Sequence, residues 1–157
     1  MFKIEIAKEK DLEAYRSLRR IAITGKDKEM FGSTPEMIAE EVARPEKEWV
    51  EDITATDKFI VLAFEADDPI GMGSVIKKED EKWYMRSLYV KEDHRDSGIG
   101  KQIVRVGLEE ISNRQGKKVS AHVRNENVRS RSIFRSFGFK KTEDDLAGVG
   151  YFIELTL

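Results

Sequence analysis

The sequence predicts a mixed α/β fold in which helices flank a central, mostly antiparallel sheet of about six to seven strands. Apolar and polar residues alternate near the amino terminus, and a strand, helix, strand, helix run occupies the centre. Two further apolar segments, around Phe139 and over residues 151–157, close the chain. Since no linker, repeat or low-complexity stretch divides the 157 residues, the first and last strands must share a sheet with the central run. We therefore expect one domain over residues 1–157.

A strand and a helix open the chain. Apolar and polar residues alternate over residues 2–6, a period of two that is typical of a half-buried strand. Apolar residues then recur at helical spacing over residues 12–22, with Asp11 as a candidate N-cap and Gly25 as the stop. The pattern predicts a strand followed by a helix that ends at Gly25.

Two shorter helices are expected next. Ser33 or Thr34 can cap a helix with Pro35 in its first turn, where the missing N–H of proline leaves no helical bond unmade. The apolar residues of segment 49–53 indicate another short helical piece.

A hairpin and a third strand follow. Apolar runs at residues 59–64 and 70–76 flank the turn-rich segment 67–69, which predicts two antiparallel strands. A further strand is expected over residues 83–90, after the polar segment KKEDEK.

The second half of the chain continues as helix, strand and helix. An apolar stripe predicts a helix over residues 98–115 with Gly116 as its C-cap. A short strand over residues 119–123 and a helix over residues 128–137 come next, and Gly138 stops that helix. The two terminal strands complete the sheet.

The charge balance and residue usage exclude several classes of function. With 30 Asp and Glu against 28 Lys and Arg, the net charge of -2 provides no global field for nucleic acid or an anionic membrane. The absence of Cys excludes disulfides, a thiolate nucleophile and a Cys-based metal site. The amino terminus lacks a signal-peptide pattern, and no apolar run is long enough to span a membrane. We expect a cytoplasmic protein without a nucleic-acid or membrane partner.

One segment carries a chemical feature. In LYVKEDHRDSGIGKQIV, the expected strand ends at Val90, and a turn containing Gly98 and Gly100 opens the next helix. Unpaired N–H groups at such a helix start point toward an anion, and the glycines let the backbone approach it closely. Two glycines before a helix are also ordinary turn geometry, so this motif alone leaves both interpretations open.

Two motifs together resemble the core of the GNAT N-acetyltransferases. The run RDSGIG, residues 95–100, fits the Arg/Gln-x-x-Gly-x-Gly/Ala pattern with which that family binds the coenzyme A pyrophosphate. The later stretch NENVRSRSIFRSFGF resembles the family's Asn-x-x-Ala/Ser and Gly-Phe signature, with Asn127, Ser130, Gly138 and Phe139 in register. The resemblance is specific over residues 88–139 and looser in the first two helices.

The resemblance implies a site for acetyl-coenzyme A as the acyl-donor cosubstrate. Backbone amides from Asp96 through Lys101 would hold the pyrophosphate, while backbone groups of Leu88 and Val90 would pair with the pantetheine arm as a strand does. A backbone N–H would stabilise the oxyanion that forms during acyl transfer. The residues implied to bind the cofactor are Leu88, Tyr89, Val90, Arg95, Asp96, Ser97, Gly98, Ile99, Gly100, Lys101, Asn127, Ser130, Arg131 and Phe134.

Both proton-transfer groups that are usual in the family are missing. Tyr84 stands where the family often has a Glu base, and Phe134 stands where it often has a Tyr acid. A thiol with a reference pKa of about 8.5 leaves tolerably well without an acid, so no general acid or base is assigned. Tyr84, Ser130 and Tyr151 are the polar candidates near the acetyl group. Asp96, in place of the usual Gly, is expected to face solvent, away from the phosphates.

Histidines and arginines outside the motifs have two interpretations each. His94 and His122 are the only histidines, and because they show no metal-ligand spacing we expect structural or surface roles and no metal site. Four arginines near the last long helix would either contact the 3′-phosphate of coenzyme A or solvate the helix face. They are Arg124, Arg129, Arg131 and Arg135.

Aromatic and acidic residues of the first half are similarly ambiguous. Phe31, Trp49 and Trp83 would either line an acceptor pocket or belong to the core, and the core is the commoner place for such residues. Glu40 and Glu41 would either attract a cationic amine or lie on an exposed helix face.

These observations lead to an expected enzyme with one alternative. The expected activity is acetyl-coenzyme A-dependent N-acetyl transfer to a primary amine of a small molecule, peptide or protein, by direct attack through a tetrahedral intermediate. The alternative is a sensor module that binds coenzyme A with little or no catalysis, which the missing Glu and Tyr motivate. A nucleic-acid-binding domain built on the arginines fits the acidic balance poorly. The residues leave open the acceptor, the preferred acyl chain, and whether the chain is a monomer or a homodimer.

Overall fold

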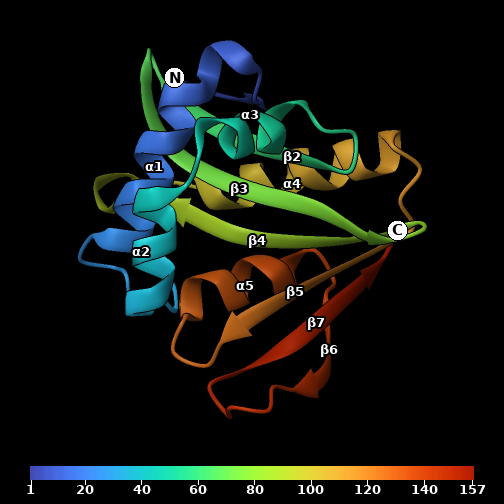
Figure 1. Cartoon of the computed structure of the whole chain (residues 1–157). Coiled ribbons are helices and arrows are strands. Elements are labelled where there is room, and N and C mark those ends of the chain that lie inside the picture. Colours follow the sequence, from blue (N-terminus) through green and yellow to red (C-terminus); the bar gives the residue numbers. More distant parts are fainter.

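A computed structural model of residues 1–157 contains one seven-stranded sheet (Figure 1). Its strand order is β1-β2-β3-β4-β5-β7-β6, and every neighbouring pair is antiparallel except β4 and β5. The strands are β1 (Phe2–Ile6), β2 (Lys58–Glu65), β3 (Asp68–Glu79), β4 (Lys82–Val90), β5 (Lys118–Arg124), β6 (Lys140–Asp144) and β7 (Gly150–Thr156). The predicted mixed, mostly antiparallel α/β fold is confirmed.

Five α-helices and two short 3-10 helices connect the strands. The α-helices are α1 (Leu12–Thr24), α2 (Pro35–Ala43), α3 (Glu46–Thr54), α4 (Ile99–Asn113) and α5 (Val128–Ser136), and the 3-10 helices are η1 (Glu9–Asp11) and η2 (Glu92–His94). No helix combines the length and the apolar character that a membrane crossing requires. His, Asp and Glu side chains form no cluster of three or more that could hold a metal ion.

The sheet has a hydrophobic core on each face. One core packs α4 and α5 against the sheet and contains Trp83 and Ile103. The other packs α1 and α3 against β2 and β3, and it contains Tyr15, Leu18 and Trp49. Both tryptophans are 2% exposed, so the core interpretation holds for them.

Local signals place most helix ends. Thr34 caps α2, because its hydroxyl accepts a hydrogen bond from the Met37 N–H at 3.2 Å. Gly25 follows α1 at the predicted stop, and Gly138 takes a φ of 93° just after α5. These ends agree with the sequence-based expectation.

The end of α4 and the β2–β3 turn differ from expectation. Gln115, with a φ of 64°, takes the left-handed position that was expected for Gly116. Gly116 is needed for space instead, because a Cβ there would lie 2.6 Å from Cδ1 of Trp83. The hairpin turns at Ala66, with a φ of 53°, so that Pro69 lies inside β3 rather than in the turn.

Candidate active site

β4 and β5 separate near the middle of the sheet. Their parallel pairing ends at Met85 and Ala121, and beyond that point the two strands diverge (Figure 1). A β-bulge lies at the separation, where Ser87 has a φ of 59° and the register on β3 shifts between Met72 and Ser74. The bulge bends the end of β4 and opens a split in the sheet.

The split exposes backbone groups at the end of β4. The Lys91 N–H donates to the Ile70 carbonyl of β3 at 2.8 Å. Because backbone groups of successive strand residues point to opposite edges, those of Leu88 and Val90 face the split. The Arg95 Nε group reaches the Val90 carbonyl from that side, at 2.8 Å. The remaining groups of Leu88 and Val90 lie beyond the last β5 pair, where an extended ligand can pair with them.

The turn that follows β4 presents six consecutive backbone N–H groups without an acceptor. No N–H from Asp96 to Lys101 donates a hydrogen bond within the protein, and the first helical bond of α4 runs from Gln102 to the Gly98 carbonyl at 3.1 Å. Gly98 has a φ of 86°, and a Cβ placed on it would meet no atom within 4 Å. These amides, which we call the amide cradle, can bind an anion at the positive end of α4.

The start of α5 forms the opposite wall. Asn127 caps this helix, because its Oδ1 accepts a hydrogen bond from the Ser130 N–H at 3.2 Å. α4 and α5 approach closely where Gly100 has no side chain, since a Cβ there would lie 2.8 Å from Cδ1 of Ile133. The cap and the glycine together bring the start of α5 beside the amide cradle.

Two cavities meet at the split. The larger cavity, of about 910 Å³, lies between the end of β4, the amide cradle and the start of α5. The smaller, the second cavity of about 400 Å³, lies on the face that α1 and α2 cover. Both are lined by Met30, Phe31, Leu88, Asn127 and Ser130. These shared residues make the two cavities adjoining chambers of one cleft.

Most residues expected to bind the cofactor line the larger cavity. Phe134 instead lines the second cavity. The Ser97 hydroxyl turns back to donate to the His94 carbonyl, and Arg131 lies outside both chambers, where its guanidinium donates to the Asn125 carbonyl at 2.8 Å. The residues that line the larger cavity as expected are Leu88, Tyr89, Val90, Arg95, Asp96, Gly98, Ile99, Gly100, Lys101, Asn127 and Ser130.

The cations around the amide cradle differ in their pairing. Arg95 is held by Asp27, with 2.8 Å between Nη2 and Oδ2. Arg129 pairs with Asp96 at 3.3 Å, and the Asp96 side chain is 74% exposed, so it faces solvent as expected but also binds an arginine. Lys101 has no ion-pair partner and lines the cavity. It is the uncompensated positive charge beside the cradle.

Two of the three polar catalytic candidates, Tyr84 and Ser130, line the second cavity. Tyr151 lies on the face of β7 that is turned away from this cavity. It packs against the core there, with the Lys141 ammonium 5.3 Å from its ring centre. The structure therefore removes Tyr151 from the candidates. Burial raises the pKa of Tyr84, so its phenol is protonated at neutral pH and suits a hydrogen-bond donor better than a base.

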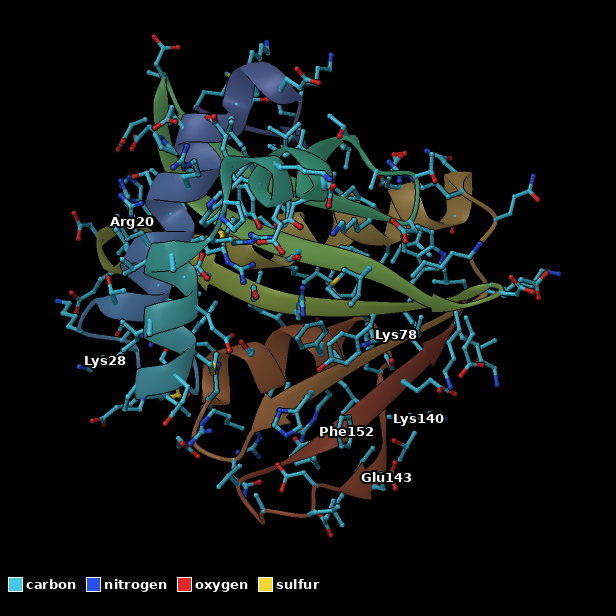
Figure 2. The ribbon with its side chains drawn as sticks, in the orientation of Figure 1. Arg20, Lys28, Lys78, Lys140, Glu143 and Phe152 are labelled. Atoms are coloured by element: carbon cyan, nitrogen blue, oxygen red, sulfur yellow. The ribbon has the colours of Figure 1, made fainter.

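A structural or surface role was expected for His122, and its side chain also lines the second cavity. Its Nε2 lies 2.7 Å from Oδ2 of Asp145, and its ring packs edge-on against Phe152 at 5.1 Å (Phe152 is labelled in Figure 2). The hydrogen bond to His122 is the main reason that the pKa of Asp145 lies below its ordinary value. The alternation of β5, which turns the even-numbered residues away from the α5 core, was the only sequence signal that could have indicated this position.

The early helices contribute apolar and neutralised groups. Phe31 lines both cavities and also packs against the core that contains Tyr15. Glu41 is neither an exposed helix-face residue nor a group that attracts an amine, because it is 7% exposed and pairs with Arg19 at 2.8 Å. Its charge is neutralised by an arginine from α1.

Comparison with known proteins identifies a matching family and similar solved structures. Residues 27–139 match the family model described as the acetyltransferase (GNAT) family. No curated protein matches the chain. The PaiA N-acetyltransferase from Thermoplasma acidophilum, solved in complex with coenzyme A, is 20% identical with a TM-score of 0.79, over 100% of this chain and 99% of that one.

Two further solved structures share the fold. A GNAT-family acetyltransferase from Staphylococcus aureus Mu50 is 13% identical with a TM-score of 0.77, over 100% of this chain and 99% of that one. The ribosomal-protein-S18-alanine N-acetyltransferase from Escherichia coli is 14% identical with a TM-score of 0.67, over 100% of this chain and 93% of that one. At these identities the likeness concerns the fold.

Proposed function

Because the chain belongs to the acetyltransferase (GNAT) family, we propose that it transfers an acetyl group from acetyl-coenzyme A to a primary amine. The observation that carries the proposal is the amide cradle beside the unpaired end of β4. Together these two features suit a long ligand that has phosphates at one end and amides along its arm. One structural neighbour was solved with coenzyme A, which supports the choice of cofactor.

The cleft suggests how the cofactor lies. The pyrophosphate would accept hydrogen bonds from the N–H groups between Asp96 and Lys101, with the Lys101 ammonium adding charge. The pantetheine arm would pair with the Leu88 carbonyl and the Val90 N–H, in place of the strand pairing that β5 gives up. Asn127 and Ser130, which line both chambers, would lie beside the thioester end of the arm.

The amine would reach the thioester from the second cavity. Its nitrogen attacks the carbonyl carbon, a C–N bond forms, and the oxyanion of the tetrahedral intermediate accepts a hydrogen bond from the Leu88 N–H. The C–S bond then breaks, coenzyme A leaves as the thiolate, and the amide product loses the proton that the amine brought. Binding both substrates in one cleft also raises the reaction rate, because it holds the two reacting groups close together.

The base that accepts that proton would lie in the second cavity. Tyr84 occupies the usual Glu position but is protonated, and Phe134 occupies the usual Tyr position and has no proton to exchange. We propose His122 as the base, with Asp145 holding the ring through Nε2. The other ring nitrogen, Nδ1, makes no hydrogen bond within the protein and is available to the amine.

Thiol release tests the proposed activity. The chain has no Cys, so a thiol reagent reports only coenzyme A set free from acetyl-coenzyme A. We expect at least one primary amine to accelerate thiol release above the hydrolysis seen without amine, with one acetylated product per thiol by mass spectrometry. If acetyl-coenzyme A binds but no amine accelerates release, the sensor alternative is correct instead.

A further inference from the structure

The second cavity has an unusual charge composition for a site that receives an amine. Three arginines and one histidine line it, and none of its lining residues is Asp or Glu. The positively charged lining residues are Arg19, Arg86 and Arg124. An acceptor that enters as a polycation would meet like charge and no carboxylate, which is unfavourable.

Pairing leaves one of these arginines uncompensated. Arg19 is bound to Glu41 at 2.8 Å, and Arg124 is bound to Glu126 at 3.1 Å. Arg86 is exposed, makes no ion pair and donates no side-chain hydrogen bond, although it lies on the cavity wall. It is the only arginine of the cavity whose charge no carboxylate of the protein offsets.

Arg86 also lies where it can meet an acceptor. It is the residue before the bulge at Ser87, just past the last β4–β5 pair at Met85, so its strand has no β5 partner there. Tyr84 and Arg86 both line the cavity and share a face of β4, because they are two residues apart on the strand before the bulge. Leu88, which lines both chambers, also lines this cavity, so Arg86 shares the cavity with the expected point of acetyl transfer.

From these observations we infer that the acceptor is a small amine that also carries an anionic group, a carboxylate or a phosphate, and that Arg86 binds this group. The inference rests on the proposed acetyl transfer and names its substrate class. Guanidinium forms paired, charge-assisted hydrogen bonds with both kinds of oxyanion. A volume of about 400 Å³ suits a molecule of amino-acid size.

Matched amines test the substrate class by thiol release. Each acid-bearing amine is compared with the same amine without its acid: 4-aminobutyrate with butylamine, leucine with leucinamide, and phosphoethanolamine with ethanolamine. Spermidine represents the polycations. We expect the acid-bearing member of at least one pair to have the higher kcat/KM by about tenfold or more. The first two pairs report on carboxylate and the third on phosphate.

Variants of Arg86 connect the preference to this residue. Arg86→Gln is expected to raise KM for the preferred amine by about ten- to a hundredfold, with Arg86→Lys in between and Arg86→Glu shifting the preference toward spermidine. Arg20→Gln is the matched control, because Arg20 is also exposed and unpaired but points outward from α1 (Figure 2). The Kd for acetyl-coenzyme A is expected to stay the same in all four variants.

The outcomes separate the two proposals. If spermidine or the acid-free amines are acetylated equally well or better, or if Arg86→Gln leaves KM unchanged, the inferred substrate class is wrong while acetyl transfer stands. If acetyl-coenzyme A binds and no amine of the panel releases thiol, the proposed activity itself is contradicted.

Discussion

Three residues around the cleft hold a left-handed backbone. They are Ser87 at a φ of 59°, Asp96 at 61° and Gly98 at 86°. For the two that are not glycine, this conformation costs about 1 kcal/mol or more, and such residues persist only where their surroundings hold them. Ser87 turns the end of β4 away from β5, and Asp96 and Gly98 aim the cradle amides outward. Local strain thus occurs where the proposed cofactor would lie, as it also does in the turns at Ala66, Glu81 and Gln115.

The negative charge of Asp96 disfavours binding of a pyrophosphate at the proposed site. We predict that Asp96→Asn lowers the Kd for acetyl-coenzyme A about three- to tenfold at low salt, because a nearby negative charge disappears and Arg129 is released. Asn tolerates the left-handed conformation, so the backbone is preserved. Calorimetric titration measures the change, and Asp80→Asn in the distant β3–β4 turn is the control. An unchanged or higher Kd would show that no phosphate lies near residue 96.

The proposed base gives a second prediction for a single side chain. His122→Gln is expected to lower kcat/KM about a hundredfold near neutral pH, with no change in the Kd for acetyl-coenzyme A. Asp145→Asn, which acts only through the ring, is expected to have a smaller effect. The deficit of His122→Gln is expected to shrink as pH rises, because hydroxide can then accept the proton of the attacking nitrogen in place of the ring. A deficit that is constant across the pH–rate profile would mean that His122 is structural.

At the scale of elements, the start of α5 combines a structural and a proposed binding role in Asn127. Asn127→Ala removes the cap and is expected to lower the free energy of unfolding by about 1 kcal/mol and to weaken cofactor binding. Asn127→Asp keeps the oxygen that caps Ser130 but removes the amide donor and adds charge. It should retain stability while the Kd for acetyl-coenzyme A rises about tenfold. Wild-type affinity in Asn127→Asp would restrict the side chain to capping.

Element types and most boundaries could be predicted from local chemistry. Thr34 with Pro35, Gly25 and Gly138 mark helix ends by rules that need only a few neighbouring residues. Local rules failed where a contact distant in sequence decides the conformation. Gly116 is required because Trp83 lies against it, not because a helix cap needs a left-handed residue there.

The bulge at Ser87 escaped prediction for a related reason. Alternation over residues 83–90 indicates one continuous strand, whereas the structure inserts a residue where the pairing with β3 shifts. The register of Met72 and Ser74 against β4 depends on the whole hairpin, and nothing in the local sequence reports it. The cradle could be predicted because its glycines lie next to the start of the helix in the sequence.

At the scale of the whole molecule, a buried network joins the early helices to the sheet. Asp52 of α3 accepts a hydrogen bond from Tyr15 of α1 at 2.6 Å and lies 2.7 Å from Arg44 and 3.2 Å from Lys58 of β2. Burial raises the pKa of Tyr15 to about 12. Burial alone would raise the pKa of Asp52, but the Arg44 and Tyr15 partners outweigh it and hold that pKa below its ordinary value.

This network predicts a pH dependence of stability. A carboxyl whose pKa is lower in the folded state contributes stability above its unfolded value of about 4, and this contribution is lost as pH falls through the folded value. Asp52→Asn is therefore expected to lower the free energy of unfolding by about 3 kcal/mol at neutral pH. Urea titrations should show the gap between wild type and variant closing below about pH 4. A gap that is independent of pH would contradict the assigned role of the charge.

The cleft is assembled from parts that the sequence keeps apart. Asp27 reaches Arg95 across 68 positions, and His122 meets Asp145 across 23, so no spacing rule brings either pair together. The end of β4 and the amide cradle come from one continuous segment, 88–101, and this wall of the larger cavity could be predicted. The wall of the second cavity depends on which side chains of β4 and β5 share a face, and Arg86 became a candidate only when its lack of a carboxylate partner was visible.

Acetyl-coenzyme A is proposed to lie on the amide cradle, and calorimetric titration of three proteins tests this placement. Gly98→Trp places a bulky side chain in the open space over the cradle. Gly148→Trp is matched in strain, because Gly148 also has a positive φ, 73°, and no atom within 4 Å of its Cβ position, but it lines neither cavity. We predict micromolar binding by the wild type and by Gly148→Trp, and a loss of a hundredfold or more in Gly98→Trp. Equal affinity in all three, or no binding by folded wild type, would contradict the proposed cofactor site.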